Sequence, residues 1–360
     1  MKVTTEAQLA EAIRDAQGPL SITGGGTRPV GRSFGTPLEI AIAGISLYEP
    51  GALTMVAGAG TPLAEIEAAL AAEGQRLPFE PALWGPVLGA AGASTIGGVV
   101  AANVSGPRRI QAGACRDSLI GVRFVDGRGD AIKSGGRVMK NVTGYDLARL
   151  LAGSWGTLGA LSEVAFKLLP AAPAQATVVL DLPAGAAPTA LAAALASPYD
   201  VSGAGWLPGT GAIVRLEGLA ASVRYRAAQV RMLLERFGPA RIEEDGSAAL
   251  WQALRDVTPF VGRDGDLWRL SVKPGDAPGI IARLGCEVVL DWGGGLIWAL
   301  MPEGTDARAQ ASPYTGHASL MRGAAEGAVF QPEPAPVAAL SAGLRAQFDP
   351  RGILNPGRMS

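Results

Sequence analysis

Short apolar runs alternate with amphipathic stretches along the first 170 residues of the chain. The runs have the length and residue types of β-strands and lie at residues 20–23, 38–42, 53–57 and 119–125. Glycine-dense turns separate them from helical stretches, of which 62–73 is the clearest, because Leu63, Ile66 and Leu70 recur on one face. This alternation predicts a mixed α/β domain with helices packed on sheets.

A Pro- and Ala-rich passage, LPAAPAQA at 169–176, separates this domain from a second set of predicted elements. Further strands are predicted at 177–182, 212–216, 267–272 and 296–300, and a helix at 220–237. A second Pro-rich run, QPEPAP at 331–336, precedes a final helix and the tail FDPRGILNPGRM. We therefore divide the chain into residues 1–170, 171–335 and 336–360, with the last part returning from the second domain.

Composition narrows the class of protein. A chain of 360 residues is too long for one ordinary core. Hydrophobic residues make up 48% against 18% charged, and the formal net charge is −1, which excludes a disordered chain and a nucleic-acid binder driven by phosphate contacts. Only Cys115 and Cys286 are present, so neither a disulfide framework nor a cysteine-based zinc or iron–sulfur site is expected.

The apolar content is not arranged as a membrane span. The first 18 residues carry three acidic side chains and read as an amphipathic helix, not as a signal peptide. The most apolar stretch, 174–197, is interrupted by an aspartate and two prolines, whereas a span needs roughly 20 apolar residues. We expect a cytoplasmic protein in a reducing compartment, with any membrane association provided by partner subunits.

Two glycine-rich segments have the composition of phosphate-binding loops. In SITGGGTR, at 21–28, glycines permit positive φ and let backbone N–H groups converge on a phosphate oxygen. In GASTIGGVVAANVSGP, at 92–107, small residues let a helix terminus or loop approach a diphosphate. A tight turn between strands is the alternative for the first segment, and a close helix–helix crossing for the second.

Two further segments carry candidate chemistry. In VMKNVTGYDLARLLAGSWGTLGALSEVAFKLLP, at 138–170, a short leucine-lined helix with Asp146 near its start leads into a strand. In ILNPGRM, at 353–359, Asn355 precedes Pro356, which predicts an extended conformation and an amide free to hydrogen-bond outward. A surface turn is the alternative for this tail.

In this order, the four segments resemble the FAD-binding (PCMH-type) fold of the vanillyl-alcohol oxidase and p-cresol methylhydroxylase superfamily. KNVTGYDLARLLAGSWGTLG and FDPRGILNPGRM resemble two signatures of its lactate, glycolate and D-2-hydroxyglutarate dehydrogenase branch. The short chain and the variant SITGGGTR are most similar to the FAD-binding E subunits of bacterial glycolate oxidases. The resemblance implies an α+β fold: a PCMH-type domain of two α/β subdomains at 1–170, an α+β cap for substrate or docking at 171–335, and a segment at 336–360 completing the flavin site.

The resemblance also implies which residues contact FAD. One side of the diphosphate would be lined by Gly24, Gly25, Gly26 and Thr27, and the other by Thr95, Gly97, Gly98, Ala101 and Asn103. The signature near the cofactor would contribute Asn141, Gly144, Tyr145 and Asp146, the adenosine half would contact Gly156, Thr157, Leu158 and Gly159, and Asn355 would lie beside the isoalloxazine.

The chain departs from some members of that superfamily in its histidines. Members with covalent flavin carry a histidine in or near the first glycine-rich loop, and here the only histidine is His317. The resemblance therefore implies non-covalent FAD. Branch members that use a metal carry paired histidines, so no metal site of that kind is expected.

The implied reaction is oxidation of a small 2-hydroxy acid such as glycolate, with hydride passing to the flavin and electrons to an iron–sulfur partner. His317 as base and Arg322 as carboxylate ligand are the candidate catalytic pair.

A lone histidine is also an ordinary core residue, which leaves a second hypothesis open. In that hypothesis the chain is a non-catalytic or electron-relay FAD subunit, and a sister FAD-binding subunit holds the substrate site. Both hypotheses imply a sister flavoprotein and an iron–sulfur subunit.

A dinucleotide-binding site of the Rossmann type is a further alternative for the glycines. VAGAG at 56–60 follows a strand and precedes a helix, with Glu80 at a suitable distance. The third small residue of the fingerprint is missing, because Thr61 and Pro62 continue into Leu63. The pattern therefore argues against this alternative.

Overall fold

The computed structural model describes residues 1–136 and 144–359. The first part of the chain forms two sheets. Three parallel strands, in the order β1-β3-β2, are β1 (Lys2–Val3), β3 (Thr36–Ile40) and β2 (Leu20–Thr23). Five antiparallel strands, in the order β4-β5-β9-β7-β8, are β4 (Ile45–Glu49), β5 (Thr54–Gly58), β9 (Ala160–Lys167), β7 (Leu119–Val125) and β8 (Ala131–Gly135).

Helices pack around these sheets, and two short strands form a small ribbon. The helices are α1 (Glu6–Arg14), α2 (Leu63–Ala72), α3 (Ile96–Ala101), α4 (Arg109–Ala112), α5 (Cys115–Ser118) and α6 (Leu147–Leu151), and the ribbon pairs β6 (Gln75–Arg76) with β10 (Leu169–Pro170). The predicted face of α2 is buried at Leu63, Ile66 and Leu70, because a helix hides its apolar stripe against the sheet. The predicted mixed α/β architecture of this part is confirmed.

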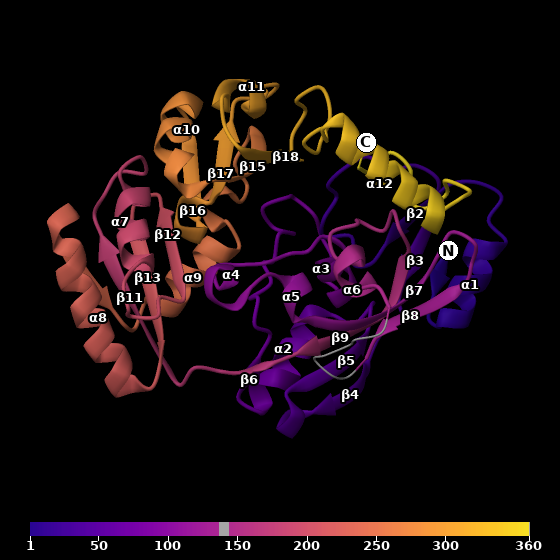
Figure 1. Ribbon diagram of the computed structural model, residues 1–360, viewed down its shortest axis with the longest axis horizontal. Coiled ribbons are helices and arrows are strands. Elements are labelled where there is room, and N and C mark those ends of the chain that lie inside the picture. The colour runs from indigo at the N-terminus through magenta and orange to yellow at the C-terminus, as the bar shows by residue number, and fades with distance from the viewer. Residues whose placement is uncertain (137–143, 360) are drawn as a thin grey trace.

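The middle of the chain forms one eight-stranded sheet within the described residues. Its strands, in spatial order, are β14 (Ala240–Glu243), β11 (Ala174–Leu180), β13 (Gly211–Gly218), β12 (Gly203–Leu207), β16 (Glu287–Asp291), β17 (Leu296–Met301), β15 (Asp266–Val272) and β18 (Gly316–Arg322). Its helices are α7 (Ala187–Leu195), α8 (Ala220–Leu234), α9 (Ser247–Arg255), α10 (Ala277–Leu284) and α11 (Ala307–Ala311). Figure 1 shows this sheet and its helices beside the first part. We propose that they form the cap domain of the three-part division.

Both faces of this sheet are buried. Successive side chains of a strand point to opposite sides, so alternate residues belong to different cores. Trp268, Leu270 and Ile297 belong to a core that also contains residues of α7, α8 and α10. The alternate positions Leu267 and Trp298 belong instead to the core of the first part. The second face of the sheet therefore packs against the first part of the chain.

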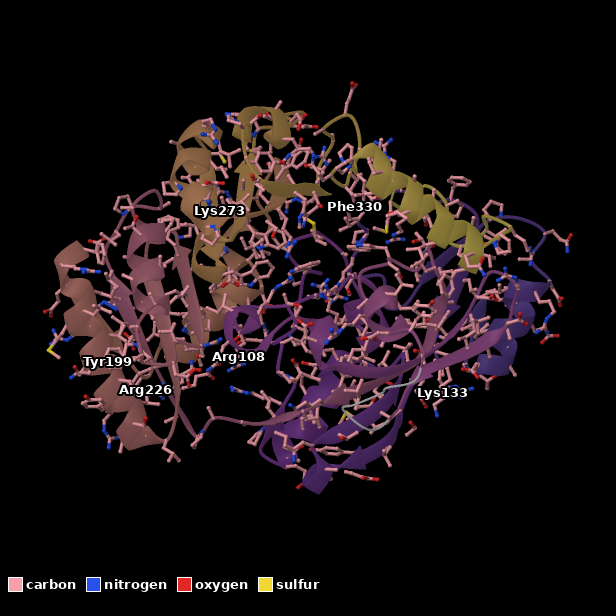
Figure 2. The ribbon with its side chains drawn as sticks, viewed as in Figure 1. Arg108, Lys133, Tyr199, Arg226, Lys273 and Phe330 are labelled. Carbon is pink, nitrogen blue, oxygen red and sulfur yellow. The ribbon has the colours of Figure 1, made fainter. Side chains whose placement is uncertain are left out.

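Buried ion pairs join the two parts. Arg215 on β13 donates from both terminal nitrogens to the two carboxylate oxygens of Glu80, each at 2.9 Å. Glu217 accepts from Arg108 and, at 2.8 Å, from Arg76 of the first part, and Figure 2 shows Arg108 where the two parts meet. Burial alone raises the pKa of Glu217, but the surrounding arginines outweigh it and hold that pKa well below its usual range. The pairs bind the cap to the first part.

The end of the chain returns to the first part. Helix α12 (Ala335–Phe348) lies beside it (Figure 1), and Gly127 donates its N–H to the Phe348 carbonyl at 2.9 Å. Leu354 then pairs with Leu20 as a parallel bridge next to β2. These contacts bring the C-terminal segment back to the first part, and its role in completing the flavin site stays a prediction. Within residues 1–136 and 144–359, no helix is long and apolar enough to cross a membrane.

Candidate functional site: a glycine-lined cavity between the two sheets of the first part

A cavity lined largely by glycines and other small residues lies between the two sheets of the first part. Its walls come from the end of β2 and the loop after it, from α3, from the segment before β9 and from the C-terminal tail. The lining residues are Ile22, Thr23, Gly24, Gly25, Gly26, Thr27, Arg28, Ile40, Ala59, Thr95, Gly97, Gly98, Ala101, Ser154, Trp155, Gly156, Gly159, Ala160, Leu161, Asn355 and Arg358.

The first glycine loop is pressed against the second glycine-rich segment. A Cβ on Gly24 would lie 2.5 Å from Thr95 Oγ1, and one on Gly25 only 1.6 Å from the Ala93 carbonyl oxygen. Gly26 has a φ of +69°, which favours glycine, and no heavy atom near it would block a Cβ. Glycine is therefore required at 24 and 25 by contact between two walls of the cavity.

Helix α3 starts at that contact. Thr95 is its N-cap and accepts a hydrogen bond from the Gly98 N–H at 3.4 Å. A Cβ on Gly97 would lie 2.7 Å from that of Ala59, so only glycine lets α3 approach the end of β5 so closely. The sequence places small residues here because backbone forms the cavity wall.

Asn355 lies at the other end of the cavity, and the expectation of an extended residue with a free amide is wrong. Its φ is +47°, in the left-handed region that asparagine tolerates. Its side-chain oxygen accepts from the Ile22 N–H at 2.6 Å, and its side-chain nitrogen donates to the Trp155 carbonyl at 2.9 Å. The residue is 2% exposed, so it joins β2 to the 154–159 segment with its amide fully used.

Two arginines at the cavity were missed by the sequence prediction. Arg28 is 8% exposed, donates only to neutral oxygens, the shortest being Ser94 Oγ at 2.8 Å, and has a buried Nε without a partner. Arg358 donates to the Arg28 carbonyl at 3.2 Å, and its buried Nε is also unpaired. Neither pairs with a carboxylate among the residues described by the structure.

These arginines give the cavity a positive charge that lacks a counter-charge within the described chain. Burial lowers the pKa of Arg28 to about 10 and also lowers the pKa of Arg358. Ser154 adds a buried hydroxyl without a partner. Unpaired donors around a backbone-lined space fit the diphosphate of FAD, whose oxygens are charged acceptors. The signals in the sequence were the arginines of GGGTR and NPGRM.

Several predicted contacts lie away from the cavity lining. Asn103 accepts from the Arg116 N–H at 3.1 Å, Thr157 donates to the Ser154 carbonyl at 2.7 Å, and Leu158 is buried. Asp146 caps α6 by accepting from the Arg149 N–H at 3.1 Å, while Gly144 and Tyr145 are exposed. Asn141 lies outside the described residues. The contacts of these seven residues with FAD stay predictions.

The candidate catalytic pair lies on β18, and neither residue lines the cavity. His317 is paired in register with Ser271 of β15, and burial together with nearby Arg269 and Arg109 lowers its pKa. Arg322 donates to the carbonyls of Val87 and Arg263, both at 2.6 Å. A carboxylate would compete with these two bonds, so the role of Arg322 stays a prediction. Within residues 1–136 and 144–359, no three His, Cys, Asp or Glu side chains are placed to hold a metal ion.

Known proteins resemble both this sequence and this fold. Residues 1–135 match the family described as FAD binding domain. The glycolate oxidase subunit GlcE of Escherichia coli (strain K12) is 37% identical over 357 residues, which covers 98% of this chain and 95% of that protein. The glycolate oxidase subunit GlcD of Bacillus subtilis (strain 168) is 48% identical over 77 residues, 21% of this chain and 16% of that protein.

A solved structure extends the likeness to the fold. An alkyldihydroxyacetonephosphate synthase superposes with a TM-score of 0.69 at 16% identity, over 99% of this chain and 75% of that one. The predicted fold class and FAD as cofactor are confirmed. The chain belongs to the family of the glycolate oxidase subunit GlcE, among FAD-linked oxidoreductases, and carries an FAD binding domain at residues 1–135.

Proposed function

We propose that this chain is the FAD-binding subunit of a glycolate-type 2-hydroxy acid oxidase or dehydrogenase complex and holds its flavin non-covalently. The observation that carries the proposal is the cavity between the two sheets, where Arg28 and Arg358 have buried nitrogens without partners. We expect partners of two kinds, a sister FAD-binding subunit and an iron–sulfur subunit. The location we propose is cytoplasmic, with membrane association through partners.

The residues of the cavity would act by binding and orientation. Gly24 and Gly25 hold the first loop against the second, so that backbone faces the diphosphate. Arg28 supplies positive charge next to it, and Asn355 fixes the end of β2 relative to Trp155. Bound FAD would supply the acceptor of hydride from the substrate carbon.

His317 is the proposed base for the hydroxyl proton of the substrate. Its lowered pKa keeps the imidazole neutral at pH 7, which is the form that accepts a proton. A glycolate-oxidising site in this chain would require the substrate to lie between this imidazole and the flavin.

The competing proposal is an electron-relay subunit whose sister chain holds the substrate site. The observation in its favour is that His317 and Arg322 lie outside the cavity lining, with Arg322 bonded to two backbone carbonyls. In that case the cavity would hold FAD and the substrate residues would lie on the sister subunit.

Anaerobic mixing with glycolate or D-lactate tests both proposals. Bleaching of the flavin absorbance in the purified chain alone supports a catalytic subunit, and bleaching only after addition of the sister chain supports the relay. In the catalytic case, His317→Ala should abolish bleaching. A protein that stays colourless after incubation with FAD contradicts both proposals. Yellow colour retained in an acid-precipitated pellet contradicts non-covalent binding.

A further inference from the structure

A second group of unpaired arginines lies where the cap sheet packs against the first part. Arg269 on β15 is in register with Trp298 of β17 and Ser319 of β18. Its guanidinium carbon is 5.9 Å from the ring centroid of Trp298, 5.8 Å from that of Trp84 and 5.2 Å from that of Trp292. Trp84 belongs to the first part, so indoles from both parts surround this one guanidinium.

A second guanidinium faces the same indole. Arg109 on α4, in the first part, lies 4.5 Å from the ring centroid of Trp292. It therefore shares Trp292 with Arg269 of the cap, and the two positive charges repel each other. This arrangement brings two like charges together across the interface, which proteins avoid unless a counter-charge is present.

Neither guanidinium has a polar partner among residues 1–136 and 144–359. No hydrogen bond or ion pair from either side chain occurs there, and Arg269 Nε is buried without an acceptor. Arg269 as a whole keeps partial solvent exposure, although its Nε is buried. Indole faces attract the charge but accept no in-plane N–H hydrogen bond, so the guanidinium donors stay unsatisfied.

Other titratable groups nearby do not neutralise the pair. Asp291 is the acid that acts on Arg269, but burial raises its pKa to about 7, and one of its oxygens accepts from the Trp292 N–H at 2.7 Å. Asp117 acts on Arg109, but so does the positive charge of Arg116. His317, on the strand next to Arg269, has a pKa lowered by burial and by the two arginines. The cluster therefore carries net positive charge at neutral pH.

We propose that Arg269 and Arg109 form a binding site for a small carboxylate anion at the interface between the cap and the first part. A carboxylate pairs with a guanidinium through two parallel hydrogen bonds in one plane. Its flat shape suits a guanidinium that lies among indole rings, whereas a tetrahedral anion needs room above and below that plane. The carboxylate class rests on the proposed function, but the anion site rests on the unpaired arginines alone.

In this site the arginine that binds the anion next to His317 is Arg269, and not Arg322. His317 lies opposite Ser271, two residues after Arg269 on the same face of β15. An anion bound to Arg269 would place its neighbouring atoms towards this imidazole. Arg322 is held by the Val87 and Arg263 carbonyls, so Arg269 is the free donor beside His317.

Oxalate binding to the FAD-loaded protein tests the site without requiring turnover. The indoles of Trp84, Trp292 and Trp298 surround Arg269, so oxalate should change tryptophan fluorescence, with calorimetry as a second readout. Arg269→Met should weaken oxalate binding roughly 10- to 100-fold, since a charge-assisted bidentate pair is lost. Arg109→Met should weaken it several-fold, roughly in proportion to one further charge.

Matched variants keep the test decisive. Arg236→Met removes an arginine that also packs on an aromatic ring, 4.8 Å from Phe237, but lies elsewhere in the cap, and it should leave binding unchanged. FAD content and thermal unfolding verify that each variant is folded. Wild-type binding in the Arg269→Met and Arg109→Met variants would overturn the proposal, as would the absence of oxalate binding. Loss of binding in Arg322→Met alone would move the site to Arg322.

Two further outcomes separate this proposal from the proposed function. Inorganic phosphate that displaces oxalate at equal concentration would overturn the carboxylate assignment. Oxalate binding without glycolate-dependent bleaching, with or without the sister chain, would leave the anion site standing and contradict the proposed function. Unchanged bleaching in Arg269→Met, together with wild-type oxalate binding in that variant, would leave the proposed function standing and overturn the anion site.

Discussion

Replacing Arg28 with methionine should have opposite effects on the FAD-free protein and on the FAD complex. Arg28 is buried at the cavity, and burial lowers its pKa from the ordinary value of an arginine to about 10. At 1.36 kcal/mol per pH unit, the FAD-free fold therefore bears about 3 kcal/mol of unfavourable energy for the charged form. A bound diphosphate would supply the missing counter-charge.

Methionine retains much of the side-chain volume and removes the charge. The change loses a hydrogen bond to Ser94 Oγ, worth about 1 kcal/mol, but also removes the cost of burying the cation. We expect the FAD-free variant to be as stable as the wild type or more stable. The Kd for FAD should rise roughly 10- to 100-fold, because a charged hydrogen bond contributes about 1.5–3 kcal/mol.

Two measurements on the same preparations check this pair of effects. Quenching of flavin fluorescence gives the Kd, and thermal unfolding with and without FAD gives the stabilisation by the ligand, which falls as the Kd rises. Arg32→Met, an exposed arginine four residues further along the same loop, is the control and should change neither quantity. A variant that binds FAD like the wild type, or that loses stability equally with and without FAD, would refute the role of Arg28.

Three further predictions follow from the same contacts. Gly25→Ala places a Cβ 1.6 Å from the Ala93 carbonyl, so the flavin-to-protein absorbance ratio should fall at least about tenfold, whereas Gly18→Ala, with no heavy atom within 4 Å, should keep it. Asn355→Ala leaves the Ile22 N–H and the Trp155 carbonyl unpaired and should cost about 2–4 kcal/mol in urea unfolding, and an unchanged midpoint would contradict it. The pKa of Glu217 is lowered in the folded state, so its contribution is present above about pH 4.3 and is lost as pH falls through the folded pKa. Glu217→Gln should therefore flatten the acid side of stability against pH, and the exposed Glu235→Gln should not.

The sequence predicted local elements well because their cause is local. The limits of β2 and β7 agree with the apolar runs at 20–23 and 119–125. In β2 alternate side chains are buried, and β7 is buried along most of its length. The leucine face of α2 was equally clear. The glycine segments were found because backbone that approaches other backbone excludes side chains, and this leaves a visible composition.

The conformation of Asn355 could not be predicted, because its cause is not local. A proline after Asn355 disfavours the right-handed helical region, and an extended residue is the usual result. Here the side chain bonds to Ile22, 333 positions away, and to Trp155, 200 positions away. These bonds hold the left-handed conformation, and the segment of sequence around Asn355 contains no trace of them.

The surroundings of the polar residues in the cap sheet could not be predicted from the local sequence either. In an antiparallel sheet with one solvated face, the alternation of β15 would place Arg269 in water and give it no function. Helices α7, α8 and α10 cover one face of this sheet, and α9 and the first part of the chain cover the other. Arg269 therefore becomes an interface residue, with Trp84 of the first part beside its guanidinium, and the unpaired charge arises only when the two parts meet. An arginine that no residue among 1–136 and 144–359 satisfies is consequently a better guide to a ligand in this protein than the lone histidine that the sequence singles out.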